Sequence, residues 1–229
     1  MCLDIEVPCY TTISRRAREL EVELPSQSDA AHIVVDSTGL KVFGEGEWKT
    51  RQHGYSKRRT WRKLQLSINA ESGEIVCAAL TTNDVHDGQM LSELVNGSNP
   101  DKVYCDGAYD SHSCYEEIAA LGAEPVIPPR RRSKPKQHGN CRKLPLKRDE
   151  VIRSMRKLGR KRWKHESGYH IRSLAETGMY RYKQIFGDKL KTRAFDAQAA
   201  EAFVKARALN IMTSLGMPKR ELTALGIVA

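Results

Sequence analysis

The sequence predicts an α/β protein built on a mixed five-stranded sheet flanked by helices. Short apolar runs rich in β-branched residues are typical of buried strands, and longer segments carry apolar residues at helical spacing. The two kinds of segment follow each other as strand, hairpin of two strands, helix, strand, helix, strand and then helices. An alternation of this kind predicts helices packed on a mixed sheet.

The first three predicted strands lie in the first third of the chain. Residues 32–36 form an apolar run that ends at Asp36, and small residues typical of a turn follow at 37–39. Residues 61–69 alternate between two faces with the period of a strand. A short Gly-containing turn then leads into residues 75–80, which we expect to be the returning strand of a hairpin.

Two further strands and six helices are predicted from the same periodicities. Residues 102–106 form a short apolar run that ends at Asp106, and residues 123–127 form another that is stopped by two prolines. Segments with helical spacing of apolar residues or with helix start and stop signals are 11–20, 87–95, 111–121, 147–158, 169–186 and 197–215. Segments without periodicity, which we expect to be loops, are 44–60 and 130–146.

The length of 229 residues suits one principal hydrophobic core. We expect residues 31–220 to form it, after a separate segment and linker at 1–30 and before a tail at 221–229. No apolar stretch is long enough to cross a membrane and no signal peptide is recognisable, so we expect a cytoplasmic protein without a membrane partner. The six cysteines include no CxxC pair, which predicts free thiols and no structural zinc site.

The charge distribution indicates a polyanionic partner. The formal net charge is +10, and nucleic acid is the commonest partner of such a protein, although a basic solvated surface would give the same total. Residues 130–148 hold nine basic side chains and no acidic one. A second basic cluster surrounds Trp61. Clusters of this kind neutralise backbone phosphates, and the predicted DNA-contacting residues in them are Arg130, Arg131, Arg132, Arg62 and Lys63.

Asp36 and Asp106 share one sequence context. Each follows an apolar strand and precedes a turn of small residues. Carboxylates at the carboxyl ends of strands in an open α/β sheet point into the usual ligand crevice. The alternative is that each aspartate only caps the turn that follows it.

A third carboxylate, Glu176, lies among basic and aromatic residues on one predicted helix. At about 100° per residue, Tyr169, Arg172, Glu176 and Lys183 fall on one stripe roughly 60° wide. A glutamate flanked by cations on one face suits a surface that binds metal and phosphate. The alternative is an exposed helix in which Arg172 and Glu176 form an i,i+4 ion pair.

Three separated carboxylates predict chemistry based on Mg²⁺ or Mn²⁺, which prefer oxygen ligands. Two such ions activate an attacking hydroxyl and stabilise the leaving oxygen in phosphoryl transfer, so neither a protein nucleophile nor an organic cofactor is needed. A serine hydrolase is disfavoured, because the chain has no GxSxG motif and no histidine has a recognisable catalytic partner.

The spacing of Tyr169, Arg172, Glu176 and Lys183 resembles the Tyr-Arg-Glu-Lys signature of DDE transposases from bacterial insertion sequences. Other segments are similar to the insertion-sequence-five type of that family, and together they run from about residue 10 to residue 220. They are residues 35–41, 44–48, 61–64, 106–110, 127–130, 209–212 and 215–218.

The resemblance implies a ribonuclease-H-like fold and an enzyme that cleaves transposon ends and transfers the strands to target DNA. It implies that Asp36, Asp106 and Glu176 hold the metal. It also implies that Tyr169, Arg172 and Lys183 assist at DNA phosphates, usually in a homodimer. Members of this type carry a longer region before the first aspartate than the 35 residues present here. We therefore expect a truncated transposase with weak sequence preference.

Three other readings remain open at the level of sequence. One is a catalytically inactive DNA-binding fragment that regulates full-length transposase by joining its assemblies. Another is a general metal-dependent nuclease that cuts without strand transfer. The third is a basic scaffold protein without activity, which the ordered motifs disfavour.

Overall fold

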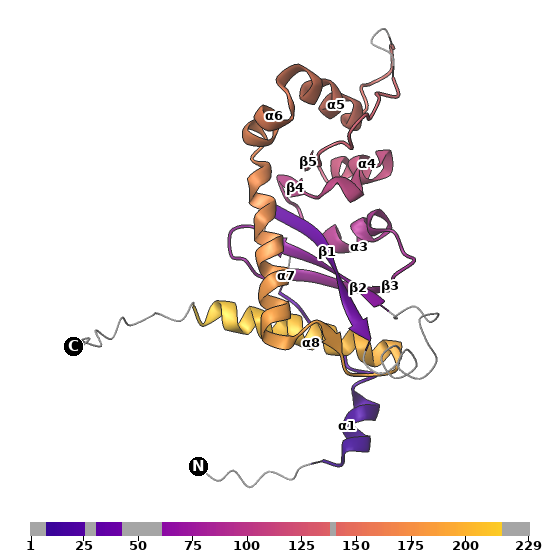
Figure 1. Ribbon diagram of the computed structural model, residues 1–229, viewed down its shortest axis with the longest axis vertical. Helices are drawn as coiled ribbons and strands as arrows, with labels where there is room; N and C mark the ends of the chain where they lie inside the picture. Colours follow the sequence, from indigo (N-terminus) through magenta and orange to yellow (C-terminus); the bar gives the residue numbers. More distant parts are fainter. Residues whose placement is uncertain (1–7, 26–30, 43–60, 138–140, 217–229) are drawn as a thin grey trace, which may run out of the picture.

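The protein is a single mixed sheet with helices on both faces (Figure 1). The computed structural model describes residues 8–25, 31–42, 61–137 and 141–216. The strands run in the spatial order β3-β2-β1-β4-β5, and a short β6 also pairs with β1. The predicted architecture, a mixed sheet flanked by helices, is therefore confirmed.

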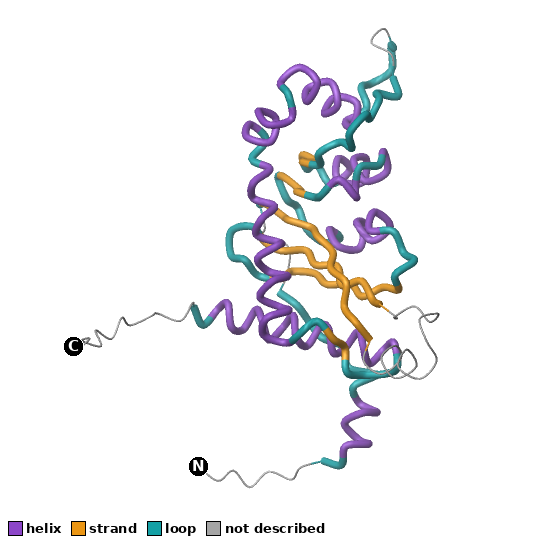
Figure 2. The backbone as a smooth tube through the Cα atoms, viewed as in Figure 1, coloured by secondary structure: helices purple, strands orange, loops and turns teal. Residues whose placement is uncertain are grey.

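The first three strands form an antiparallel meander, and the remaining strands join the sheet in parallel. Figure 2 shows the strands in orange among the purple helices. Within the meander, β2 and β3 are joined by the tight turn that the sequence predicts after residue 69. The six strands are β1 (His32–Val42), β2 (Trp61–Asn69), β3 (Ile75–Thr82), β4 (Lys102–Tyr104), β5 (Glu124–Val126) and β6 (Lys189–Leu190).

Two expectations about the sheet are wrong. The predicted turn at 37–39 is part of β1, because antiparallel pairing with β2 continues to Lys41 opposite Trp61. That pairing satisfies the backbone of the small residues, and Gly39 gives room to a neighbouring ring: a Cβ there would lie 3.3 Å from Cε3 of Trp61. The predicted five strands become six, because the two residues of β6 pair in parallel with the far end of β1.

Helices cover both faces of the sheet, and most lie close to their predicted ranges. The exceptions are the segment 160–166, which was not predicted, and residues 169–172, which form a 3₁₀ turn. The helical elements are α1 (Tyr10–Arg16), η1 (Asp87–Met90), α3 (Leu91–Val95), η2 (Gly107–Tyr109), α4 (His112–Ala120), α5 (Lys147–Leu158), α6 (Arg160–Glu166), η3 (Tyr169–Arg172), α7 (Ser173–Phe186) and α8 (Phe195–Ser214).

Helix α6 was missed because its sequence carries almost no apolar periodicity. Trp163 is its only buried residue, and the other positions are charged or polar. The glycine at 159 separates it from α5 and adopts a φ of 81°, a left-handed value that favours glycine. Helix α6 therefore depends on one buried indole rather than on an amphipathic stripe.

The core has two parts, one on each face of the sheet. Even-numbered residues of β1 and β2, such as Val34, Leu64 and Leu66, pack beneath α7 and α8. Odd-numbered residues of β1, such as Ile33 and Val35, pack against α3 and α4. Since every second residue points to the same face, this division fixes which side chains of β1 can meet α7.

Helix α7 lies unusually close to β2 because it carries a glycine at the contact. A Cβ on Gly178 would lie 2.6 Å from Cδ1 of Ile68, which is only 1% exposed. Helix α8 is attached to the edge strand β3 by Asn210. Its amide accepts from the backbone N–H of Ile75 and donates to the carbonyl of the same residue, both at 2.7 Å.

Several sequence features lie outside the described residues. They include the predicted loop at 44–60 with the motif at 44–48, the end of the motif at 215–218, and the tail at 221–229. Within the predicted N-terminal segment, α1 has no buried residue and extends away from the sheet (Figure 1). None of the described helices is long and apolar enough to cross a membrane.

Candidate active site

Asp36 lies in the middle of β1, not at its carboxyl end as the sequence suggested. It shares a face with Val34 and Leu40, the face that α7 covers. On one edge of β1, β4 pairs only as far as Val34, and β6 begins only at Lys41. Asp36 therefore lies at a gap between two parallel neighbours, and its side chain is 15% exposed at this interruption of the sheet.

Asp106 lies beside this gap because of the register of the two parallel strands. Val34 is paired with Tyr104, so Asp36 and Asp106 each come two residues after the last pair. Oδ1 of Asp106 accepts from the backbone N–H of Ala108 at 2.7 Å, which caps η2. The capping role considered from the sequence is therefore real, and it leaves Oδ2 without a hydrogen bond to any described residue.

Arg172 connects two of the three predicted carboxylates. Its Nη1 donates to Oδ2 of Asp36 at 3.0 Å, and its Nη2 donates to Oε1 of Glu176 in a short contact. The i,i+4 ion pair weighed from the sequence is thus present, but the same guanidinium also reaches a strand 136 positions away in the chain. The fold therefore brings Glu176 to the side of the sheet where Asp36 lies.

The electrostatics of Asp36 reflect this grouping. Burial raises its pKa, while the N–H of Ser37 and the Arg172 guanidinium lower it. Asp106 and Glu176 raise it further, because each adds a negative charge near the first. The net pKa is raised. The three carboxylates therefore repel one another, and a cation among them relieves that repulsion.

Tyr169 is buried at the base of this cluster rather than exposed on a helix face. It is 8% exposed, its ring centroid lies 6.3 Å from that of Trp163, and the cations of Arg172 and Lys164 lie over its ring. Burial raises the pKa of its hydroxyl to about 12. Tyr169 is therefore a neutral phenol at neutral pH, and the face of its ring contacts the Arg172 guanidinium.

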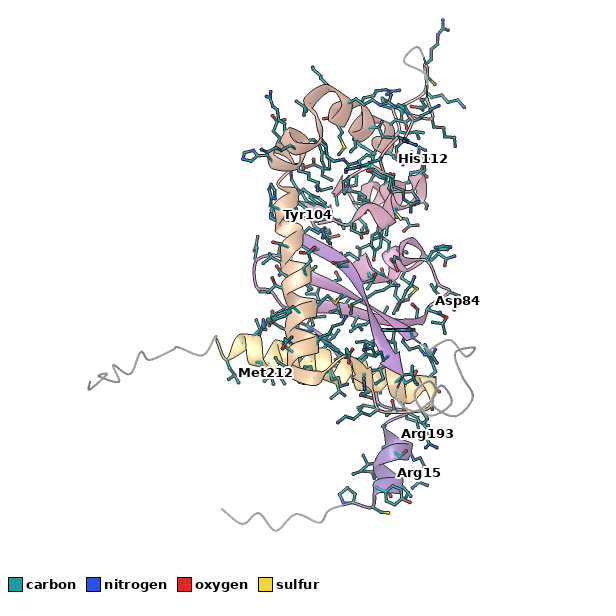
Figure 3. All side chains as sticks on the ribbon, in the orientation of Figure 1. Arg15, Asp84, Tyr104, His112, Arg193 and Met212 are labelled. Carbon is teal, nitrogen blue, oxygen red and sulfur yellow. The ribbon has the colours of Figure 1, made fainter. Side chains whose placement is uncertain are left out.

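The remaining member of the signature lies further along α7. Lys183 is seven residues after Glu176, so it lies on the same side of α7 about 10 Å along the axis. Tyr169 and Arg172 are in a 3₁₀ turn, whereas Glu176 and Lys183 are in α7. The four residues therefore do not form the single α-helical stripe that the sequence predicts. Tyr104 lies near the start of the segment that carries Tyr169 and Arg172 (Figure 3). The hydroxyl of Tyr104 would lie 3.6 Å from a Cβ on Gly168.

The three carboxylates fit a hard divalent cation by chemistry but not yet by position. All the donors are carboxylate oxygens, which Mg²⁺ and Mn²⁺ prefer. Among the described residues, however, no three His, Cys, Asp or Glu side chains converge closely enough to hold an ion. Arg172 is the cation that neutralises Asp36 and Glu176 in this arrangement.

The structure does not bring Arg62 and Lys63 to the carboxylates. Neighbouring strand residues point to opposite faces, so these two side chains diverge. Arg62 donates to Oε1 of Gln198 at 2.9 Å and lies over the ring of Phe195. Lys63 donates to Oδ1 of Asp87 at 3.2 Å.

The basic segment after β5 is irregular, as expected, but its described residues are held firmly. Its anchor is Asp110, whose buried carboxylate accepts two hydrogen bonds from Arg148, one from the N–H of Arg130 and one from Ser133. Burial alone would raise the pKa of Asp110, but these donors outweigh burial and leave it lowered. Sequence reasoning did not assign a role to Asp110, although it ends the motif at 106–110.

Arg130 connects the basic segment to the loop that carries Asp106. Its guanidinium donates to the carbonyls of Gly107 and Ala108, at 3.2 and 3.4 Å. The carbonyl of Pro128 would lie 3.5 Å from a Cβ on Gly107, so the two segments are in close contact. The first arginine of the segment is therefore a direct neighbour of the candidate active site.

Comparisons with known proteins show which family the chain belongs to. The sequence matches two family models, both described as a transposase DDE domain, over residues 27–211 and 1–45. The first match covers most of the chain. The chain belongs to the transposase DDE domain family. This confirms the family suggested by the sequence motifs, at the level of the DDE domain.

One solved structure gives a more distant likeness. The chain is similar to a protein in the "Cryo-EM structure of piggyBac transposase synaptic complex with hairpin DNA", at 12% identity and a TM-score of 0.31. The similarity covers 82% of this chain and 55% of that chain, so this chain spans about half the length of that transposase. Enzymes of the DDE family cleave and transfer DNA strands and generally use divalent metal ions.

Proposed function

We propose that this chain catalyses metal-dependent cleavage of DNA strands at the ends of a bacterial insertion sequence and their transfer to target DNA. The proposal assigns it to the insertion-sequence-five type, with a ribonuclease-H-like fold and a homodimer as the working form. The strand order supports that fold, because β1 is central, carries Asp36 and pairs in parallel with β4, which Asp106 follows.

One observation carries the proposal. Arg172 forms ion pairs with both Asp36 and Glu176, although the two acids are 140 residues apart in the sequence. Asp106 lies two residues after the adjacent strand β4 and is close enough to raise the pKa of Asp36. A fold that pairs two of the carboxylates with one cation and brings the third near them supports a site for one or two Mg²⁺ or Mn²⁺ ions, once Arg172 has given up its carboxylate partners.

In this proposal Asp36, Asp106 and Glu176 are the metal ligands and the catalytic residues. When bound, the metal supplies an activated hydroxyl and stabilises the leaving oxygen in phosphoryl transfer. Arg172 would then exchange its two carboxylate partners for a DNA phosphate, to which a guanidinium can donate two parallel hydrogen bonds. Tyr169 would hold the Arg172 guanidinium in position over its ring. Lys183 and the three arginines at 130–132 would bind backbone phosphates nearby. Arg62 and Lys63 would do so only by giving up their present partners.

A cleavage and strand-transfer assay tests the proposal. The substrate is labelled duplex DNA carrying candidate insertion-sequence ends, with Mg²⁺ or Mn²⁺ or with EDTA. Asp106→Asn removes the charge that holds the metal and keeps the size, so we expect the rate to fall by more than about a hundredfold. The matched control is Asp101→Asn at the opposite end of β4, where the aspartate is exposed. The control should cleave as the parent does.

Two outcomes would favour other functions. Cleavage that needs the metal and Asp106 but yields no transfer product with any end sequence would indicate a general nuclease. Duplex binding without cleavage by either protein, under all metal conditions, would indicate an inactive fragment that regulates an intact transposase. Equal cleavage by Asp106→Asn and by the parent would refute the assignment of the catalytic residues.

A further inference from the structure

A cavity of about 280 Å³ lies between the basic segment after β5 and the helices α5 and α6. Five arginines line it and no carboxylate does. Its floor is apolar, formed by Ile152 and Met155, which are 3% and 9% exposed. The arginines are Arg130, Arg131, Arg132, Arg156 and Arg160.

The positive charges in this cavity are not compensated. Arg156 donates to the carbonyl of Ser133 at 2.8 Å, Arg160 donates to that of Pro129, and Arg130 donates to those of Gly107 and Ala108. These acceptors are neutral, so they orient the guanidinium groups without cancelling their charge. Each guanidinium has five N–H donors and uses one or two of them here, so donors remain for a ligand.

Two of the arginines have no assigned partner. Arg131 and Arg132 are exposed, and their side chains form no hydrogen bond or ion pair with the residues that the structure describes. Asp110, the carboxylate that anchors this segment, does not line the cavity and is already bound by Arg148, which does not line it either. An anion entering the cavity would therefore meet free donors rather than displace an internal carboxylate.

The backbone at Arg132 is strained in a way that favours this role. Its φ is 69°, the only positive value outside glycine in the described part of the chain. A left-handed conformation is unfavourable for an arginine, because its Cβ crowds the backbone. Strained residues of this kind are concentrated at ligand clamps. The strain is maintained by the hydrogen bonds that Asp110 and Arg156 make to the neighbouring Ser133.

We propose that this five-arginine cavity binds one phosphate group of the DNA backbone, apart from the phosphate that is cleaved. None of the three carboxylates lines the cavity, so it is separate from the reacting centre. Arg130 nevertheless contacts the loop that follows Asp106, so a phosphate held here would fix DNA relative to that carboxylate. This inference rests on the proposed function only for the identity of its ligand as DNA.

A double variant tests the cavity without destroying its frame. Arg131→Gln with Arg132→Gly removes the two unpartnered cations, and glycine accepts the φ of 69° without strain. The matched control, Arg142→Gln with Lys143→Gln, removes the same charge from exposed residues that do not line the cavity. Both proteins should keep the melting temperature of the parent within a few degrees.

The first measurement uses inorganic pyrophosphate as the probe, in EDTA, and follows the melting temperature. We expect pyrophosphate to raise it in the parent and in the control, and to have at least several-fold weaker effect in the cavity variant. Equal responses of the cavity variant and the control would overturn the proposal, because net charge alone would then explain the binding.

The second measurement identifies the source of the phosphate. Anisotropy of a labelled duplex, in EDTA at several salt concentrations, gives the slope of log K against log salt. Loss of one phosphate contact should reduce this slope by about 0.9 in the cavity variant, and by less in the control. A lost response to pyrophosphate with unchanged duplex binding would overturn the assignment to DNA and leave a free-phosphate site. Neither measurement needs cleavage, so a failure of the proposed activity would not affect them.

Discussion

The close contact between α7 and the sheet gives a prediction whose magnitude can be worked out. Alanine at 178 would place a Cβ 2.6 Å from Cδ1 of Ile68 and 4.0 Å from its Cγ1. Gly178→Ala gains about 1 kcal/mol of helix propensity. Overpacking a buried contact costs about 1–3 kcal/mol. We therefore expect a net loss of roughly 0–2 kcal/mol in the free energy of unfolding.

The clash can be isolated by removing one atom. Ile68→Val deletes Cδ1 and should cost about 0.5–1.5 kcal/mol on its own. In that background the nearest obstacle to the new methyl group is gone, so Gly178→Ala should now stabilise the protein by up to about 1 kcal/mol. The coupling between the two substitutions, measured by urea denaturation of all four proteins, should be about 1–3 kcal/mol. Equal effects of Gly178→Ala in both backgrounds would refute this account of the packing.

The same four proteins test whether the distance between α7 and the sheet matters for function. Glu176 lies in the first turn of α7, half a turn from Gly178, so a displaced helix moves this carboxylate away from Asp36. Small displacements of catalytic groups are costly, and we expect Gly178→Ala to slow metal-dependent cleavage on the order of tenfold. The double variant should regain most of the rate. A double variant that regains stability but still cleaves slowly would show that the loss of rate does not come from the displacement of α7.

The remaining predictions concern the polar contacts that hold the site and the fold. Arg172→Gln should lower the free energy of unfolding in EDTA by about 1–3 kcal/mol, because the half-buried Asp36 loses its charged donor. Mn²⁺ should raise the melting temperature of this variant more than that of the parent. Equal increases in melting temperature would contradict an exchange between Arg172 and metal. Asp110→Asn should cost about 3 kcal/mol at pH 7. Since the folded pKa of Asp110 is lowered, this difference should be complete above the unfolded pKa of about 4 and should be lost as the pH falls through the lower, folded pKa. A difference that persists in strong acid would argue against the ion pair with Arg148. Asn210→Ala should cost about 2–4 kcal/mol in urea denaturation, because it leaves the N–H and carbonyl of Ile75 without partners. Asn210→Asp should cost at least as much at pH 7, because it keeps the acceptor but sets a buried carboxylate against the carbonyl of Ile75.

Local periodicity was sufficient for most of the secondary structure, and it failed where pairing partners decide the outcome. The hairpin of β2 and β3 and the helix at 147–158 follow directly from patterns of apolar residues. Residues 37–39 look like a turn in isolation, and only the long antiparallel partner β2 makes them a strand. Strand β6 has two residues, too few for any periodicity, and it exists because β1 extends far enough to pair with it.

The sequence by itself determined which acidic residues are candidates for the reactive groups. Two aspartates in matching contexts, a glutamate among basic residues and a net charge of +10 were enough to predict acid chemistry on a polyanion. The order of the motifs was enough to indicate the family. These features survive without a structure because they depend on residue types and on spacing along one element.

Only the tertiary structure decided how those groups meet. The gap between β4 and β6 places Asp36 at an interruption of the sheet, and the register with β4 aligns it with Asp106. The role of Arg172 as a bridge, the burial of Tyr169 and the anchoring of the basic segment by Asp110 all join positions that are far apart in the chain. Such contacts depend on strand register and on the distance between a helix and a sheet, which side-chain packing across the whole core sets and no local pattern encodes.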